Sequence, residues 1–145
     1  MNKALFVLGL AVLPFAAGSA ATPRALGFKL DGTSWILSTL AGRTQIGHSR
    51  ITLIFDAARI SGTDGCNQYN GPYSAAETHL TIGPEVLSTQ MGCPAKIMRL
   101  ASSYMSVLLG ANAYRIGDGQ LLLMDATGAV LATFVPSTKP LAASS

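Results

Sequence analysis

The sequence predicts a mainly β (α+β) domain, with an antiparallel sheet and a single helix at about residues 94–109. Two observations point to this class. Short runs of β-forming residues alternate with Gly, Asp and Asn turn residues both before and after residues 95–109. Residues 95–109 contain no Gly or Pro and carry apolar residues at helical spacing. The length suits one domain, because about 120 residues can bury roughly two thirds of their unfolded surface.

The strands expected before the helix are short and separated by turns. The first, 34–40, follows the turn residues Asp31-Gly32, and 51–55 should pair with 58–62 in a hairpin around Asp56-Ala57. Three further short strands are expected at 71–75, 79–82 and 86–89.

The helix and the strands after it have clear boundary signals. Pro94 stands at the start of the helix and Gly110 just past its end, as is usual for helix start and stop residues. Ile97, Ala101, Tyr104, Met105 and Leu108 form an apolar stripe that should lie against the sheet. Strands at 113–116, 121–124 and 130–135, joined at Asp118-Gly119 and Thr127-Gly128, should form a three-stranded meander.

The N-terminus reads as an export signal. Lys3 precedes an apolar run at 4–15, and small residues follow at 16–21, which is the three-part pattern of a secretory signal peptide. We therefore expect a signal peptide at 1–21, cleaved after Ala20 or Ala21, and a soluble, monomeric mature protein that does not span the membrane and lies in the periplasm or outside the cell. A flexible leader at 22–28, a domain at 29–135 and a flexible tail at 136–145 complete the predicted organisation.

Charge argues against a nucleic-acid partner. Without Lys3, nine basic and seven acidic side chains remain, and the basic residues form no cluster and no pattern interleaved with aromatic residues. Cys66 and Cys93, the only cysteines, would meet an oxidising compartment after export. A bridge between them would stabilise the fold by at most about 3.5 kcal/mol, and the alternative is a pair of buried thiols.

No catalytic or metal site is expected. A reactive thiol would need a base, and only His48 and His79 could serve, one in a loop and the other at a strand edge. The same two histidines and two cysteines lack the close spacing of a zinc site, and no cofactor motif is present. Asp64, beside the cysteine loop, fits a turn-capping carboxylate better than a catalytic one.

Two unusual stretches carry a family resemblance. The first, 62–73, contains Gly62, Gly65, Cys66, Asn67, Tyr69, Gly71 and Tyr73; it suggests a sharp turn with positive φ at Gly65, Asn67 or Gly71. The second contains Thr89, Met91 and Cys93 and leads into the helix. Together with Trp35 in an early W-x-L pattern, these residues resemble the META domain family, also called HslJ-like, over about residues 29–135. The helix lacks the acidic residue that follows the second cysteine in that family.

The resemblance implies an antiparallel sheet wrapped in barrel-like fashion around one helix, in exported or envelope proteins linked to stress tolerance. It implies no reaction. Our leading hypothesis is therefore a non-enzymatic protein with a binding or stabilising role in envelope homeostasis, in which a Cys66–Cys93 bridge pins the loop to the helix start. One alternative is a carrier of a small apolar ligand between sheet and helix, with Trp35, Phe55, Tyr69 and Tyr73 as possible lining residues. Another is a secreted inhibitor of a hydrolase that presents the loop around Asn67.

Overall fold

The structure is a computed structural model that describes residues 11, 18, 30–44 and 50–138. Ten strands and one helix are formed within these residues: β1 (Thr33–Leu40), β2 (Arg43–Thr44), β3 (Thr52–Asp56), β4 (Arg59–Thr63), β5 (Gln68–Ala76), β6 (His79–Ile82), β7 (Leu87–Ser88), α1 (Ala95–Gly110), β8 (Ala113–Gly117), β9 (Gln120–Met124) and β10 (Val130–Pro136). The predicted signal peptide at 1–21 except residues 11 and 18, the whole predicted leader at 22–28 and His48 lie outside the described residues.

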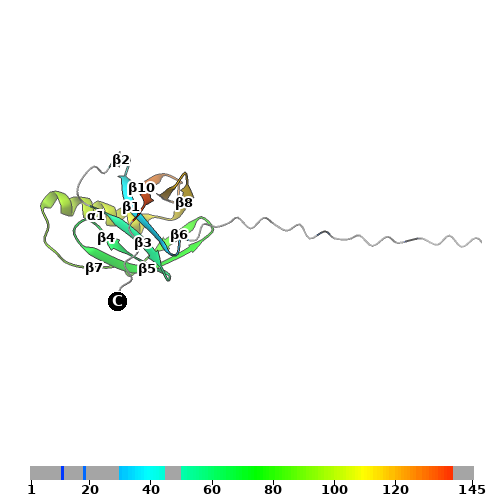
Figure 1. Cartoon of the computed structure of the whole chain (residues 1–145), viewed down its shortest axis with the longest axis horizontal. Coiled ribbons are helices and arrows are strands. Elements are labelled where there is room, and N and C mark those ends of the chain that lie inside the picture. The colour runs from blue at the N-terminus through cyan, green and yellow to red at the C-terminus, as the bar shows by residue number, and fades with distance from the viewer. Residues whose placement is uncertain (1–10, 12–17, 19–29, 45–49, 139–145) are drawn as a thin grey trace, which may run out of the picture.

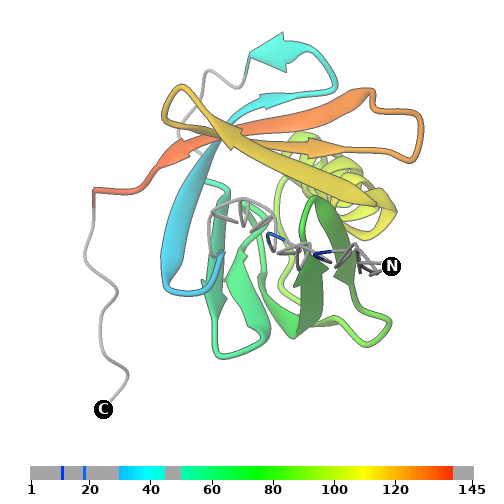
Figure 2. The ribbon, with the colours of Figure 1, turned by 90° about the vertical axis from the view of Figure 1, so that its right-hand side faces the viewer.

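Eight of the strands close into an antiparallel barrel. Their order is β1-β3-β4-β5-β6-β8-β9-β10, and β10 returns to pair with β1. The two-residue strands stand outside this ring, β2 beside β1 and β7 beside β5. Figures 1 and 2 show the strands curving around a common interior with the helix packed against them. The predicted class, a β barrel with a single helix, is confirmed.

Tight hairpins set the register of neighbouring strands. At the β3–β4 turn, Ala57 and Ala58 both have positive φ, and at the β8–β9 turn Asp118 and Gly119 do. Two successive positive φ values match the type I′ geometry that follows the right-handed twist of paired strands. The β3–β4 turn therefore lies one residue later than Asp56-Ala57, because Asp56 pairs with Arg59.

The barrel interior is filled by alternate side chains of the strands. Because successive strand residues point to opposite faces, each strand contributes every second residue. The side chains with essentially no exposure include Leu53 and Phe55 of β3, Ile60 of β4, Tyr69 of β5, Leu121 and Leu123 of β9 and Phe134 of β10. The core is thus a packed apolar centre shared by strands that are distant in sequence.

The helix packs its predicted stripe onto this core. Ala101, Tyr104 and Leu108, spaced by three and four residues, are its buried side chains. The Tyr104 ring contacts the ring of Tyr69 at a centroid distance of 5.9 Å and that of Phe134 at 6.3 Å. Since β5 and β10 stand on opposite sides of the ring of strands, a single helical side chain spans the interior.

Some boundaries differ from those expected. Strand β5 starts at Gln68 and not at 71, because residues 68–72 pair with β4 directly after the cysteine loop. The last strand runs through Pro136, so this residue of the expected tail belongs to the sheet, and the Ser137 amide donates a hydrogen bond to the Ser34 carbonyl oxygen. The short β2 was not anticipated, since two residues carry no periodic signal.

Candidate functional site

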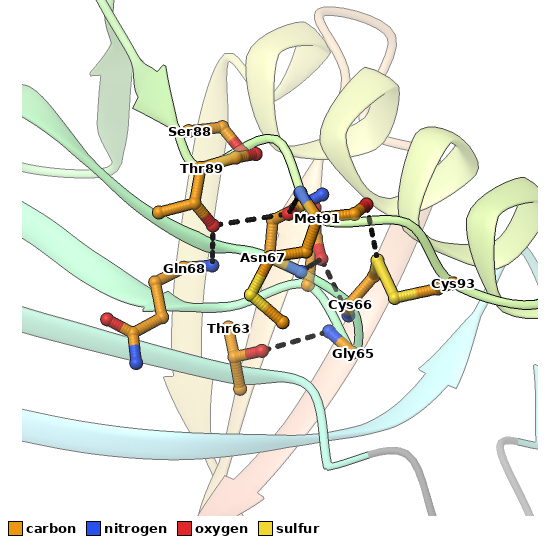
Figure 3. The surroundings of a disulfide bond; sticks show 10 residues. Thr63, Gly65, Cys66, Asn67, Gln68, Ser88, Thr89, Met91 and Cys93 are labelled. Carbon is orange, nitrogen blue, oxygen red and sulfur yellow. Dashed lines mark hydrogen bonds between the residues drawn. A yellow bond between two sulfur atoms is a disulfide. The ribbon is translucent and has the colours of Figure 1, made fainter.

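The two unusual stretches meet at a disulfide. The bond joins Cys66, in the loop between β4 and β5, to Cys93, one residue before the N-cap of the helix, with a Cα–Cα distance of 6.0 Å (Figure 3). The expected bridge is therefore confirmed, and the alternative of two free thiols is wrong for this structure. Both sulfurs are used in this bond, so neither can act as a thiolate nucleophile or ligand while it is intact.

Asp64 shapes the loop that carries Cys66. Its Oδ1 accepts hydrogen bonds from the backbone amides of Cys66, at 2.9 Å, and Asn67, at 2.6 Å. The Asp64 amide in turn donates to the Asn67 carbonyl oxygen, and Gly65 supplies the positive φ of the turn. Asp64 is buried, and its carboxylate satisfies backbone donors, which is the turn-capping role expected for it.

Asn67 connects this loop to the second motif. Its Oδ1 accepts a hydrogen bond from the Met91 amide at 2.6 Å and another from Thr89 Oγ1 at 3.2 Å. Thr89 Oγ1 itself accepts from the Gln68 amide, and Cys66 Sγ lies 3.5 Å from the Met91 carbonyl oxygen (Figure 3). The sulfur carries no proton in a disulfide, so this last approach is a contact only. The amide, the hydroxyl and the bridge together fasten residues 89–93 to the loop.

Two buried hydroxyl groups lie beneath the loop. Tyr69 Oη donates to the Thr52 carbonyl oxygen at 2.6 Å and lies 2.7 Å from Tyr104 Oη. Because Tyr69 has one hydroxyl proton, Tyr104 must be the donor between the two tyrosines. Burial raises the pKa of both groups, chiefly by desolvating the phenolate form. The pair therefore stays neutral at ordinary pH and acts as a hydrogen-bonded link between barrel and helix.

The motif glycines allow close approach of backbones. A Cβ atom on Gly62 would stand 2.1 Å from the Thr52 carbonyl oxygen, and one on Gly71 would stand 2.9 Å from the Glu85 carbonyl oxygen. Three positions were proposed for a residue with positive φ, and Gly65 is the one that has it. Asn67 does not have positive φ, and neither does Gly71, which lies within β5.

The remaining motif residues lie apart from the loop. Trp35 is buried in β1, and its Nε1 donates to Thr33 Oγ1. Tyr73 stands farther along β5, where its ring meets Phe55 edge-on at 4.9 Å. Both aromatic side chains serve the packing of the barrel.

The arrangement offers no cluster of metal ligands within the part of the chain that the structure describes. No three side chains of His, Cys, Asp or Glu gather there as metal ligands would. The polar side chains of the site form hydrogen bonds with backbone amides, with backbone carbonyl groups and with one another. Their chemical role is therefore to fix the backbone conformation.

A family model described as the META domain matches residues 28–138. The chain belongs to the META domain family. Solved structures agree with this META domain fold. One is described as an NMR structure of the protein from Burkholderia xenovorans: it is 26% identical, has a TM-score of 0.62, and the match covers 96% of this chain and all of that one.

Two further structures share the fold at lower identity. An NMR structure, described only as that of the protein, is 20% identical, with a TM-score of 0.59 over 74% of this chain and 91% of that one. A crystal structure of a DUF4847 family protein from Bacteroides vulgatus is 12% identical, with a TM-score of 0.58 over 76% of this chain and 96% of that one. No curated protein matches the sequence. Within residues 30–44 and 50–138, no helix of this META domain is long and apolar enough to cross a membrane.

Sequence reasoning missed one residue of the site. Tyr104 was assigned to the apolar stripe of the helix, which is correct, but its hydroxyl link to Tyr69 was not anticipated. The available signal was a tyrosine at the centre of a buried stripe, since a buried phenol requires a hydrogen-bond partner.

Proposed function

We propose that the protein is a non-enzymatic domain of the cell envelope, with a binding or stabilising role exerted through its outer surface. One observation carries this proposal: the polar groups of its two motifs serve the fold. Asp64 and Asn67 accept backbone hydrogen bonds, and both cysteines are oxidised. A site poised for chemistry would instead hold a nucleophile beside a base, both reachable by substrate.

Export to the periplasm or the cell exterior is the second part of the proposal. A disulfide persists in oxidising compartments and is rare in the cytosol, so its presence supports the signal peptide read from residues 1–21. A role in envelope stress rests on the family resemblance alone.

The filled barrel favours this function over carriage of a ligand. A guest between sheet and helix would have to displace Tyr104, whose ring spans from Tyr69 to Phe134. The hydrolase-inhibitor hypothesis has one supporting observation: the Cys66–Cys93 bond fixes the loop around Asn67 to the start of the helix, and an inhibitory loop needs such a constraint. That loop, however, turns the Asn67 side chain inward to bind Met91 and Thr89.

Two measurements test the proposal. Fractionation of the producing cells, with mass spectrometry of the protein, should find it in the envelope or the medium, starting at Ala21 or Thr22 and carrying no free thiol. A cytosolic protein with two alkylatable cysteines would overturn the envelope assignment. Native mass spectrometry of the same material should show no bound small molecule, and a stoichiometric apolar adduct would replace our proposal with the carrier.

A further inference from the structure

Two cysteines and four methionines carry the sulfur atoms of residues 30–44 and 50–138. Both cysteines are joined in the disulfide, so neither is a free thiol. The sulfur that remains reduced in this part of the chain therefore belongs to the thioethers of Met91, Met98, Met105 and Met124. A thioether can accept one oxygen atom from a two-electron oxidant and become a sulfoxide.

The four thioethers differ in their access to solvent. The Met91 side chain is 58% exposed and that of Met98 is 49% exposed. Met105 is partly buried against the hydrophobic core, and Met124, at the end of β9, is half-buried. An oxidant dissolved in water therefore meets Met91 and Met98 more often than the other two.

The backbone is fixed at both exposed methionines. The Met91 amide donates a hydrogen bond to Asn67 Oδ1 at 2.6 Å, in the segment that the disulfide fastens to the loop (Figure 3). The Met98 amide donates to the Pro94 carbonyl oxygen at 3.0 Å, in the first turn of α1. Because these bonds involve the main chain alone at Met91 and Met98, a chemical change at the tip of either side chain leaves them in place.

The cost of a sulfoxide depends on where it forms. Its S–O group is polar, so at an exposed position water solvates it and the folded state loses little. At Met105 the same group would enter the apolar contact between the helix and the core, which destabilises the folded state. The fold therefore tolerates oxidation best at the two positions that oxidants reach first.

We propose that Met91 and Met98 form an oxidant-accepting site, whose substrates are hydrogen peroxide, hypochlorous acid and related two-electron oxidants. The sulfur lone pair attacks the oxygen of the oxidant, and the O–O or O–Cl bond breaks. The products are a sulfoxide and water from hydrogen peroxide, or a sulfoxide, chloride and a proton from hypochlorous acid. Sulfur loses two electrons in this step and the oxidant gains them.

The uptake of oxidant is stoichiometric and reversible. A thiol-dependent sulfoxide reductase restores the thioether, with the oxygen leaving as water and two thiols becoming a disulfide. This inference goes beyond the proposed function and does not depend on it, because an exposed thioether reacts with these oxidants in any compartment.

Oxidation of the bridged protein by hydrogen peroxide, followed by peptide mass spectrometry, tests the inference. Met91 and Met98 should react at about half the rate that they show when the protein is unfolded in urea, in line with their exposed fractions. Folding should slow Met105 and Met124 by a larger factor. Protein oxidised at Met91 and Met98 should keep its disulfide and the urea midpoint of the untreated protein.

A double variant tests whether the exposed pair spares the packed methionines. Met91→Leu, Met98→Leu removes both thioethers with little change in side-chain volume. With limiting hypochlorous acid, this variant should carry more sulfoxide at Met105 than the wild type and should have a lower urea midpoint. Met124→Leu is the matched control, since it removes a thioether outside the site and should leave the oxidation of Met91 and Met98 unchanged.

Three results would overturn the inference. They are an equal slowing of all four methionines by folding, a lower urea midpoint in protein oxidised at Met91 and Met98 alone, and equal oxidation of Met105 in the wild type and the double variant. None of them bears on the proposed function, which fails instead if the purified protein turns over a substrate or if the producing cell keeps it in the cytosol.

Discussion

Replacing the buried Tyr69 by phenylalanine should destabilise the fold more than replacing the buried Tyr104. Tyr69 Oη donates to the Thr52 carbonyl oxygen and accepts from Tyr104 Oη. Tyr69→Phe therefore leaves two buried polar groups without their partner, the Thr52 carbonyl and the Tyr104 hydroxyl. At about 1–3 kcal/mol for each such group, the free energy of unfolding should fall by about 2–6 kcal/mol.

Tyr104→Phe is the milder change. It removes one hydrogen bond but leaves Tyr69 free to donate to Thr52, so the cost should be about 0.5–1.5 kcal/mol. Combining the two substitutions should cost no more than Tyr69→Phe alone, because the second removes the hydroxyl that the first left unsatisfied. The double-mutant cycle should therefore show a coupling of about 1 kcal/mol or more.

Urea unfolding followed by the fluorescence of Trp35, the single tryptophan, provides the measurement. The reasoning is refuted if Tyr104→Phe costs as much as Tyr69→Phe, or if the two losses add. Either result would mean that the hydroxyl pair is hydrated or differently oriented in solution.

The same pair predicts an alkaline limit to stability. The folded state raises the pKa of both tyrosines, so above pH 10 the unfolded chain releases protons that the folded state retains. Stability should stay level as pH rises toward 10 and then fall by about 2.7 kcal/mol per pH unit for two such groups. The double Phe variant should show a shallower fall, and an equal slope would contradict the assignment.

Three further changes test the loop and its surroundings. Gly62→Ala places a methyl group 2.1 Å from a backbone carbonyl oxygen and should cost more than about 3 kcal/mol by thermal or urea unfolding, whereas Gly92→Ala meets nothing within 4 Å and should change stability by less than about 0.5 kcal/mol. Reducing the Cys66–Cys93 bond should lower the urea midpoint by an amount equivalent to about 3.5 kcal/mol at most, and an unchanged midpoint would mean that the bridge is dispensable. Asp64→Ala removes the acceptor of two backbone amides and should cost about 2–4 kcal/mol, measured against the more conservative Asp64→Asn.

Local chemistry made most of the fold predictable. Short runs of β-forming residues, Asp-Gly turns and the stripe of Ala101, Tyr104 and Leu108 act over a few residues, and the strands and helix they indicate are present. The closing pair of β1 and β10 depends on contacts across about a hundred residues, and no pattern along the chain reports it. The expectation of a barrel-like sheet came from the resemblance to the META domain family.

In the site, too, contacts between residues close in sequence could be predicted, and contacts between distant residues could not. Asp64 could be read as a turn-capping residue because its partners are two and three residues away. The bonds from Asn67 to Met91 and from Tyr69 to Tyr104 join residues 24 and 35 positions apart, so only the folded chain brings them together. Gly71 was misread as a turn residue, since a glycine needed for close backbone approach looks the same in a sequence as one needed for positive φ.

Pairing between the first and last barrel strands also governs when the domain can form. Until residues 130–136 leave the ribosome, the β10-facing edge of β1 has no partner and is a ready template for other chains. Folding must therefore wait for nearly the whole chain, and contacts of such long separation form slowly. During that interval the unpaired edge leaves the chain most exposed to aggregation.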